Sequence, residues 1–192
     1  GDEPFRAAGY DLAGVRRLRL ASPVSPDAAP PRAARLGPDD VVLVTGGAKG
    51  ITAACALGLG RATAARFALC GTSPEDAPPE GELRATLDRF AAAGLRARYY
   101  RCDVSRWDDV TALLARVRAD LGPVTAVIHG AGLNRPRRVE QVTVEDALAE
   151  CAPKLLGALH LCRALTDAPP RVFCALTSVI GVAGVPGNAW YA

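Results

Sequence analysis

Apolar runs and amphipathic segments alternate along the chain from residue 41 onward. The run from Val41 to Val44 is β-branched and apolar at every position, and it passes through glycines into a helical segment. Short apolar runs bounded by turn residues are typical of buried strands, and spacing by three and four residues is typical of an amphipathic helix. The sequence therefore predicts a strand, a tight turn and a helix. The apolar residues of that helix recur at Ile51, Ala54, Cys55, Gly58 and Leu59.

The same alternation continues to the end of the chain. Further strands are expected at 66–70, 97–102, 124–129 and 171–176, and further helices at 82–93, 108–121 and 143–166. In the last helix, Pro153 is expected to introduce a kink or a restart. The side chains expected to face inward there are Val144, Leu148, Leu155, Leu159 and Cys162.

Strands that are apolar on both faces and separated by helices indicate a parallel sheet with helices on both sides. Right-handed crossovers then lead to an α/β, doubly wound, Rossmann-like sheet with the strand order 3-2-1-4-5. Ligands of such sheets bind at the carboxyl ends of the strands, where the strand order reverses. The residues at or just past those ends are Thr45, Cys70, Asp103, His129 and Ser178.

Residues 1–40 do not follow this pattern. Residues 15–20 predict one short strand with a solvated arginine face, and five prolines between 23 and 38 interrupt regular structure. Pro- and Ala-rich segments behave as semi-extended linkers. We therefore expect a linker and the tail of a preceding domain at 1–40, and a separate domain at 41–192.

Composition and charge exclude several classes of protein. A net charge of +3 with 22% charged residues calls for no nucleic-acid or membrane partner. No apolar run has membrane-spanning length and no leader opens the sequence, so a cytoplasmic protein is expected. The six cysteines lack the paired spacing of metal or redox sites, so no metal is expected and most are interpreted as small buried hydrophobes. His160 is interpreted as structural.

The segment from Thr45 to Ile51 connects the first strand to the first helix. Its glycines permit positive φ and close approach to a ligand, and the helix start offers unpaired N–H groups to a pyrophosphate. Glycines also serve ordinary turns, so the turn alone leaves both interpretations open. Glycines at 46, 47 and 50 resemble the Thr-Gly-x-x-x-Gly-x-Gly turn of the short-chain dehydrogenase/reductase family. Thr52 replaces the last glycine of that pattern, which bears on how closely the helix packs on the strand.

Two more segments carry the resemblance. An aspartate such as Asp103, before Val104, often caps a helix, whereas the resemblance implies a contact with the adenine amino group. The turn at 129–132, His-Gly-Ala-Gly, is similar to the His-Ala-Ala-Gly form of polyketide-synthase ketoreductases, and His129 is interpreted as part of this turn and not as a general base. The cofactor-binding residues that the resemblance implies are Thr45, Gly46, Gly47, Lys49, Gly50, Ile51, Thr72, Asp103, Val104, His129, Gly130, Ala131 and Gly132.

Three residues match the catalytic pattern of the same ketoreductases. Carbonyl reduction needs a hydride donor and a group that protonates the oxygen. A tyrosine, with an unperturbed pKa of about 10, releases its proton more easily beside a lysine cation. The resemblance assigns the roles of charge partner, carbonyl donor and proton donor to Lys154, Ser178 and Tyr191 respectively.

NADPH is the expected coenzyme. No acidic residue closes the second strand, where an NAD enzyme holds the ribose hydroxyls, and Lys49 places a cation near the adenosine ribose. Against NADPH, Thr72 stands where polyketide ketoreductases usually carry an arginine. In addition, Glu75 and Asp76 would repel a phosphate if they pointed inward.

The segment 133–138 carries three arginines at 135, 137 and 138, which either meet an acidic carrier protein or its phosphopantetheine, or form a solvated loop. It lacks the Leu-Asp-Asp signature of one stereochemical class of ketoreductase, and position 183 lacks the tryptophan of the other. These features look closer to iterative synthases of the enediyne or polyunsaturated-fatty-acid kind.

The resemblance implies NADPH-dependent reduction of a β-ketoacyl thioester, carried by an acyl carrier protein, to a β-hydroxyacyl thioester in polyketide or fatty-acid assembly. Other domains of the same synthase are the further partners expected. The family fold continues past the fifth strand, so the chain is expected to be truncated there, with an apolar edge strand, and to be inactive alone. A non-catalytic docking domain and a free-standing short-chain reductase remain as alternatives.

Overall fold

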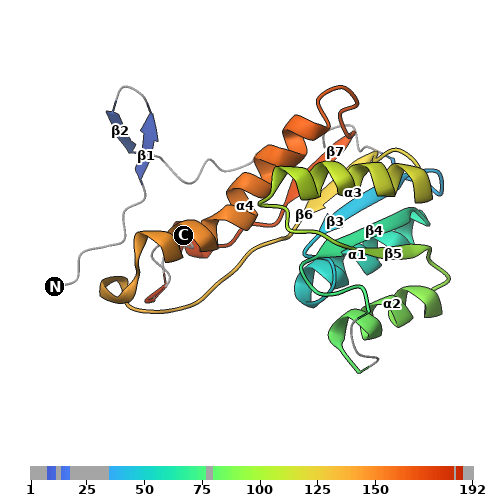
Figure 1. Cartoon of the computed structure of the whole chain (residues 1–192), viewed down its shortest axis with the longest axis horizontal. Helices are drawn as coiled ribbons and strands as arrows, with labels where there is room; N and C mark the ends of the chain where they lie inside the picture. The colour runs from blue at the N-terminus through green and yellow to red at the C-terminus, as the bar shows by residue number, and fades with distance from the viewer. Residues whose placement is uncertain (1–7, 12–13, 18–34, 77–79, 184, 188–192) are drawn as a thin grey trace, which may run out of the picture.

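The computed structural model describes residues 8–11, 14–17, 35–76, 80–183 and 185–187 (Figure 1). Its main feature is a parallel sheet of five strands in the order β5-β4-β3-β6-β7, which is the expected order 3-2-1-4-5. The strands are β3 (Val41–Thr45), β4 (Arg66–Gly71), β5 (Ala97–Arg101), β6 (Ala126–His129) and β7 (Val172–Ala175).

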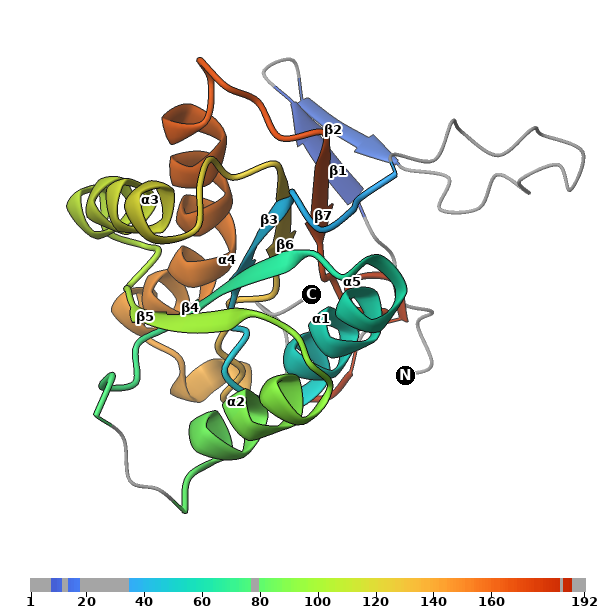
Figure 2. The ribbon, with the colours of Figure 1, turned by 90° about the vertical axis from the view of Figure 1, so that its right-hand side faces the viewer.

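Helices cover both faces of this sheet (Figure 2). One face packs against α1 (Gly50–Thr63) and α2 (Glu82–Ala92), and the other against α3 (Trp107–Asp120) and α4 (Val144–Ala164). A 3-10 turn (Val139–Gln141) precedes α4, and a short helix, α5 (Ile180–Ala183), follows β7. The doubly wound α/β fold is confirmed.

Alternation along the central strand builds two cores. Val41 and Leu43 pack toward α3 and α4, and Val42 and Val44 pack toward α1 and α2, so every residue of the run is buried. The side chains of a strand point to opposite faces in turn, so a strand with helices on both sides is apolar at each position. Glycines at positive φ, Gly94 and Gly122, follow α2 and α3 as expected stops.

The expected inward face of α4 was wrong. Val144, Leu148, Leu155 and Leu159 are each more than 60% exposed, and Cys162 is exposed too. Gly157 and Leu161 face the sheet instead. A Cβ at Gly157 would lie 2.8 Å from Val104 and 3.0 Å from His129, so the absence of a side chain allows this close approach. The helix also runs through Pro153 without a restart.

The expected apolar stripe of α1 was also displaced. Ile51, Ala54, Cys55 and Gly58 are exposed, while the buried residues are Thr52, Ala53, Ala56, Leu57 and Gly60. This helix carries small or apolar residues on nearly every side, so spacing alone did not identify the face that packs on the sheet.

The cysteine interpretation holds for two positions. Cys70 and Cys102 are buried in the core, whereas Cys55, Cys162 and Cys174 are exposed and Cys151 is half-buried. Most of the cysteines are therefore not buried hydrophobes. Within the described part of the chain, no group of His, Cys, Asp and Glu is arranged to hold a metal, and no helix there is both long and apolar enough to cross a membrane.

The N-terminal region contains a hairpin of β1 (Ala8–Asp11) and β2 (Gly14–Arg17), where one strand at 15–20 was expected. The end of the expected strand lies outside the described residues. Residues from 35 onward already belong with the sheet, because Leu36 packs in the α1/α2 core and Asp40 forms an ion pair with Arg171.

Candidate active site

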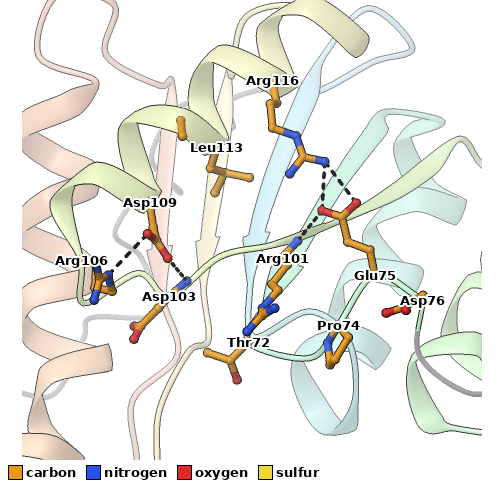
Figure 3. A pocket seen from close by; sticks show the side chains of 11 residues that line it. Thr72, Pro74, Glu75, Asp76, Arg101, Asp103, Arg106, Asp109, Leu113 and Arg116 are labelled. Atoms are coloured by element: carbon orange, nitrogen blue, oxygen red, sulfur yellow. Dashed lines mark hydrogen bonds and ion pairs between the residues drawn. The ribbon is translucent and has the colours of Figure 1, made fainter.

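Three cavities line the carboxyl edge of the sheet. The central one, of about 450 Å³, lies between the β3–α1 turn and the segment after β6. It shares Thr72 and Asp103 with an outer cavity of about 800 Å³ beside α3 (Figure 3). It shares Gly132 and Leu133 with an inner cavity of about 240 Å³ beside α4. One cleft therefore crosses the sheet at the point where the strand order reverses.

Of the expected cofactor residues, some line the central cavity and the others lie outside its lining. Those that line the central cavity are Gly46, Lys49, Thr72, Asp103, Val104, Ala131 and Gly132. Those outside its lining are Thr45, Gly47, Gly50, Ile51, His129 and Gly130. Among the latter, Thr45 and His129 are fully buried behind the cleft.

The β3–α1 turn fits an anionic ligand. Gly46 has φ +69°, and a Cβ there would lie 2.9 Å from the Gly130 carbonyl, so no other residue fits. Gly50 has φ +61° and faces open space. No side chain caps the start of α1 at Lys49. Among the described residues, the first N–H groups of the helix therefore have no capping side chain, which is the arrangement that an anion site uses.

Thr52 and Gly130 fit each other. Thr52 is buried, and a Cβ at Gly130 would meet its Oγ1 and lie 2.5 Å from its Cγ2. The sequence departs from the resembled pattern at both positions, with threonine in place of the last glycine and glycine in place of the alanine after the histidine. The missing methyl group at Gly130 makes room for the Thr52 side chain, so α1 still packs closely on β6.

A buried chain of hydrogen bonds joins the β3–α1 turn to α4. His129 Nε2 lies 2.9 Å from the Lys154 carbonyl oxygen and must donate to it. Nδ1 of the neutral ring is then an acceptor, and the Thr45 hydroxyl donates to it over 2.7 Å. The same hydroxyl oxygen accepts from the Ala131 N–H at 3.2 Å. Burial and the nearby Lys154 charge lower the pKa of His129, although its bond to the Lys154 carbonyl opposes them. A general-base role is not favoured.

Lys154 and Ser178 meet at the inner cavity. Lys154 Nζ donates to the Leu176 carbonyl over 2.9 Å, and burial lowers the pKa of its ammonium group. The Ser178 Oγ accepts from the Ile180 N–H at 3.2 Å, and no acceptor for its hydroxyl proton is found among the described residues. The third expected catalytic residue, Tyr191, lies outside the described residues.

Asp103 serves a local turn while it lines the cleft. Its Oδ1 accepts from both the backbone N–H and the hydroxyl of Ser105, at 3.0 and 2.6 Å. This is the local capping role that the sequence allowed. Asp103 also lines the central and outer cavities. Next to it, the Val104 carbonyl accepts from His160 Nδ1 at 3.0 Å, which supports a structural interpretation of His160.

Sequence reasoning missed a buried ion pair above the inner cavity. Glu150 is buried, lines that cavity and lies 2.7 Å from the Arg137 guanidinium. Its other oxygen accepts from the Arg135 N–H at 3.3 Å. For Arg137 the solvated-loop interpretation is therefore wrong, because its guanidinium points inward at α4. Glu150 lies one helical turn before Lys154, and that spacing was the signal available in the sequence.

Comparison with known proteins matches the chain to a ketoreductase-domain family and to polyketide synthases. The profile of the KR domain family matches residues 40–192. The chain is 33% identical over 189 residues to the polyketide synthase GfsA of Streptomyces halstedii. This match covers 97% of this chain and 2% of the synthase. The chain therefore spans a small part of such relatives.

Solved structures agree in fold. An N-terminal ketoreductase from the macrolactin assembly line superposes with a TM-score of 0.74 at 26% identity, over 93% of this chain and 33% of that one. An alcohol dehydrogenase from the archaeon Thermococcus sibiricus, complexed with 5-hydroxy-NADP, superposes with a TM-score of 0.67 at 25% identity. The match covers 79% of this chain and 63% of that one.

Proposed function

The chain belongs to the KR domain family, and from that premise we propose that it reduces a β-ketoacyl thioester on an acyl carrier protein, with NADPH, in polyketide or fatty-acid assembly. The observation that carries the proposal is the meeting of Lys154 and Ser178 in one cavity, at the end of a cleft that begins at the Gly46–Gly50 turn. The product is the β-hydroxyacyl thioester.

The residues of the cleft suit a dinucleotide. The N–H groups at the start of α1 would hold the pyrophosphate, and Gly50 leaves space there. When bound, NADPH supplies the hydride that the carbonyl carbon accepts. Ser178 would donate a hydrogen bond to the carbonyl oxygen, and Tyr191 would give that oxygen its proton. The Lys154 cation would favour the resulting phenolate, and His129 holds the backbone of Lys154 in place.

The preference for NADPH is supported by the charges around Thr72. No carboxylate follows β4 directly, and Lys49 lines the central cavity. Glu75 does not oppose the preference, because Arg116 pairs with it at 2.9 Å. The archaeal relative bound to an NADP derivative is consistent with this choice.

The wider setting is part of the same proposal. The carrier protein would deliver the substrate on phosphopantetheine, and other domains of the same synthase would flank this one. The residues before Arg35 would be the linker and the tail of the preceding domain, because Leu36 and Asp40 already pack with the sheet. An iterative synthase of the enediyne or polyunsaturated-fatty-acid kind is the proposed subtype. The proposed location is the cytoplasm, and the 192-residue chain alone is proposed to be inactive.

The test uses the native polypeptide that contains this chain, a β-ketoacyl thioester and NADPH, with NADPH oxidation followed by absorbance. Lys154→Ala and Ser178→Ala should each lower kcat by about 100-fold or more, as expected for loss of a group that acts in the transition state. The control Thr111→Ala removes an exposed hydroxyl on α3 and should leave kcat unchanged.

Three results would contradict the proposal. Coenzyme binding without turnover of any ketone would favour a non-catalytic docking domain. Turnover of free ketones alone, with no preference for the carrier-bound thioester, would favour a free-standing reductase. Wild-type rates in Lys154→Ala would remove the catalytic assignment.

A further inference from the structure

Arg101 ends β5 and reaches into the outer cavity. In the register of the sheet it is the partner of Gly71, the residue directly before Thr72. The two strands are parallel, so the partners point to the same face, and Gly71 has no side chain to block the way across β4. Arg101 and Thr72 both line the outer cavity (Figure 3), and Thr72 also lines the central one.

Among the described residues, none forms an ion pair or side-chain hydrogen bond with the Arg101 guanidinium. The other arginines of this cavity are engaged: Arg106 pairs with Asp109 at 3.5 Å, and Arg116 pairs with Glu75 at 2.9 Å. Arg101 is therefore the guanidinium of this cavity that is available to an anion.

Two of the four acids that line the cavity, Glu75 and Asp109, are paired with arginines. Glu75 accepts from the Arg101 backbone N–H at 3.0 Å and pairs with Arg116, and these contacts lower its pKa despite some burial. Asp109 accepts from the Asp103 N–H at 3.1 Å in addition to its ion pair. Asp76 and Asp103 also line the cavity and form no ion pair among the described residues, so their charges oppose a phosphate there.

We propose that Arg101 receives the 2′-phosphate of NADPH, in place of the arginine that the resembled ketoreductases carry at the position of Thr72. This inference rests on the proposed function. The guanidinium would come from the strand next to β4 instead of from β4 itself, since Arg101 is the register partner of Gly71 and lines the same cavity as Thr72. A planar guanidinium can bind a phosphate through two N–H groups, which makes it a strong determinant for NADPH over NADH.

The experiment measures binding in the native polypeptide by calorimetry, with NADPH, NADH, adenosine 2′,5′-bisphosphate and AMP as probes. Arg101→Gln should lower the affinity for NADPH and for the bisphosphate by about 10-fold or more, which corresponds to about 1.4 kcal/mol of binding free energy. The affinities for NADH and AMP should stay within about 2-fold of wild type. Arg98→Gln is the matched control, because Arg98 lies on the same strand and pairs with Asp120. Its affinities should not change.

A second variant tests the exchange of positions. Thr72→Arg in the Arg101→Gln background should restore the preference for NADPH, because it returns a guanidinium to the end of β4. Equal losses of NADPH and NADH affinity in Arg101→Gln would make Arg101 a structural residue and overturn the proposal, as would unchanged affinity for both.

The failure of this inference can be told from failure of the proposed function. If the wild-type protein binds NADPH and reduces the thioester, and Arg101→Gln keeps the same preference for NADPH over NADH, only the role of Arg101 is refuted. A wild-type protein that binds neither coenzyme refutes both.

Discussion

At the scale of single residues, Thr52 and Gly130 show how two departures from a sequence pattern can be one structural change. Either departure alone suggests a looser turn or a weakened helix start. In the structure the threonine side chain occupies the space that the glycine leaves. The sequence contained both residues, but only the packing of α1 against the end of β6 reveals that they are coupled.

A double-mutant cycle tests this coupling. Gly130→Ala should destabilise the fold by about 1–3 kcal/mol, the usual range for overpacking a tight site. Thr52→Gly should cost about 1 kcal/mol through its helix propensity. The double variant should be more stable than the sum of the two predicts, as measured by urea unfolding of the native polypeptide. Strict additivity would show that the residues do not interact.

The buried ring of His129 makes stability depend on pH. Its pKa in the fold lies below the ordinary value of 6.5, chiefly through burial, so below about pH 6.5 the unfolded chain binds a proton that the folded chain does not. The free energy of unfolding should therefore fall as the pH drops from about 6.5 toward the lower folded pKa, and this contribution should be flat above about pH 7.5. In His129→Gln the dependence should be shallower when urea unfolding is compared at several pH values. An identical slope in the variant would contradict the assignment.

At the scale of elements, the sequence predicted the helices and strands better than the faces they bury. The helix expected at 108–121 was found as α3, and its buried residues Val110, Leu113 and Val117 form one narrow apolar stripe. In α4 the leucines surround much of the helix, and a small residue, Gly157, decides which side approaches the sheet. Periodicity counts apolar residues, whereas close packing here depends on the absence of a side chain.

A pair of substitutions in α4 tests this orientation. Leu161→Glu places a charge in the core and should abolish cooperative unfolding or lower stability by several kcal/mol. Leu155→Glu, on the exposed face, should change stability by less than about 0.5 kcal/mol. Equal destabilisation by both variants would mean that the described face is wrong.

At the scale of the whole molecule, the strand order and the position of the cleft followed from the sequence alone. Alternating strands and helices, right-handed crossovers and the glycine turn left little choice of topology. Arg101 was not predicted, because its relevance comes from the register between β4 and β5, which joins residues 30 positions apart in Gly71 and Arg101. The inward turn of Arg137 depends likewise on a contact between a loop and a later helix.

The Thr45–His129–Lys154 chain of hydrogen bonds has a consequence for the order of events in a catalytic cycle. Thr45 directly precedes the glycines that would grip the coenzyme, and Lys154 stands at the other end of the cleft. Under the proposed function, a shift of the turn on coenzyme binding would reach the backbone that carries the ammonium group through this imidazole. Binding of the coenzyme at the turn would then be coupled to the position of the lysine before the ketone binds.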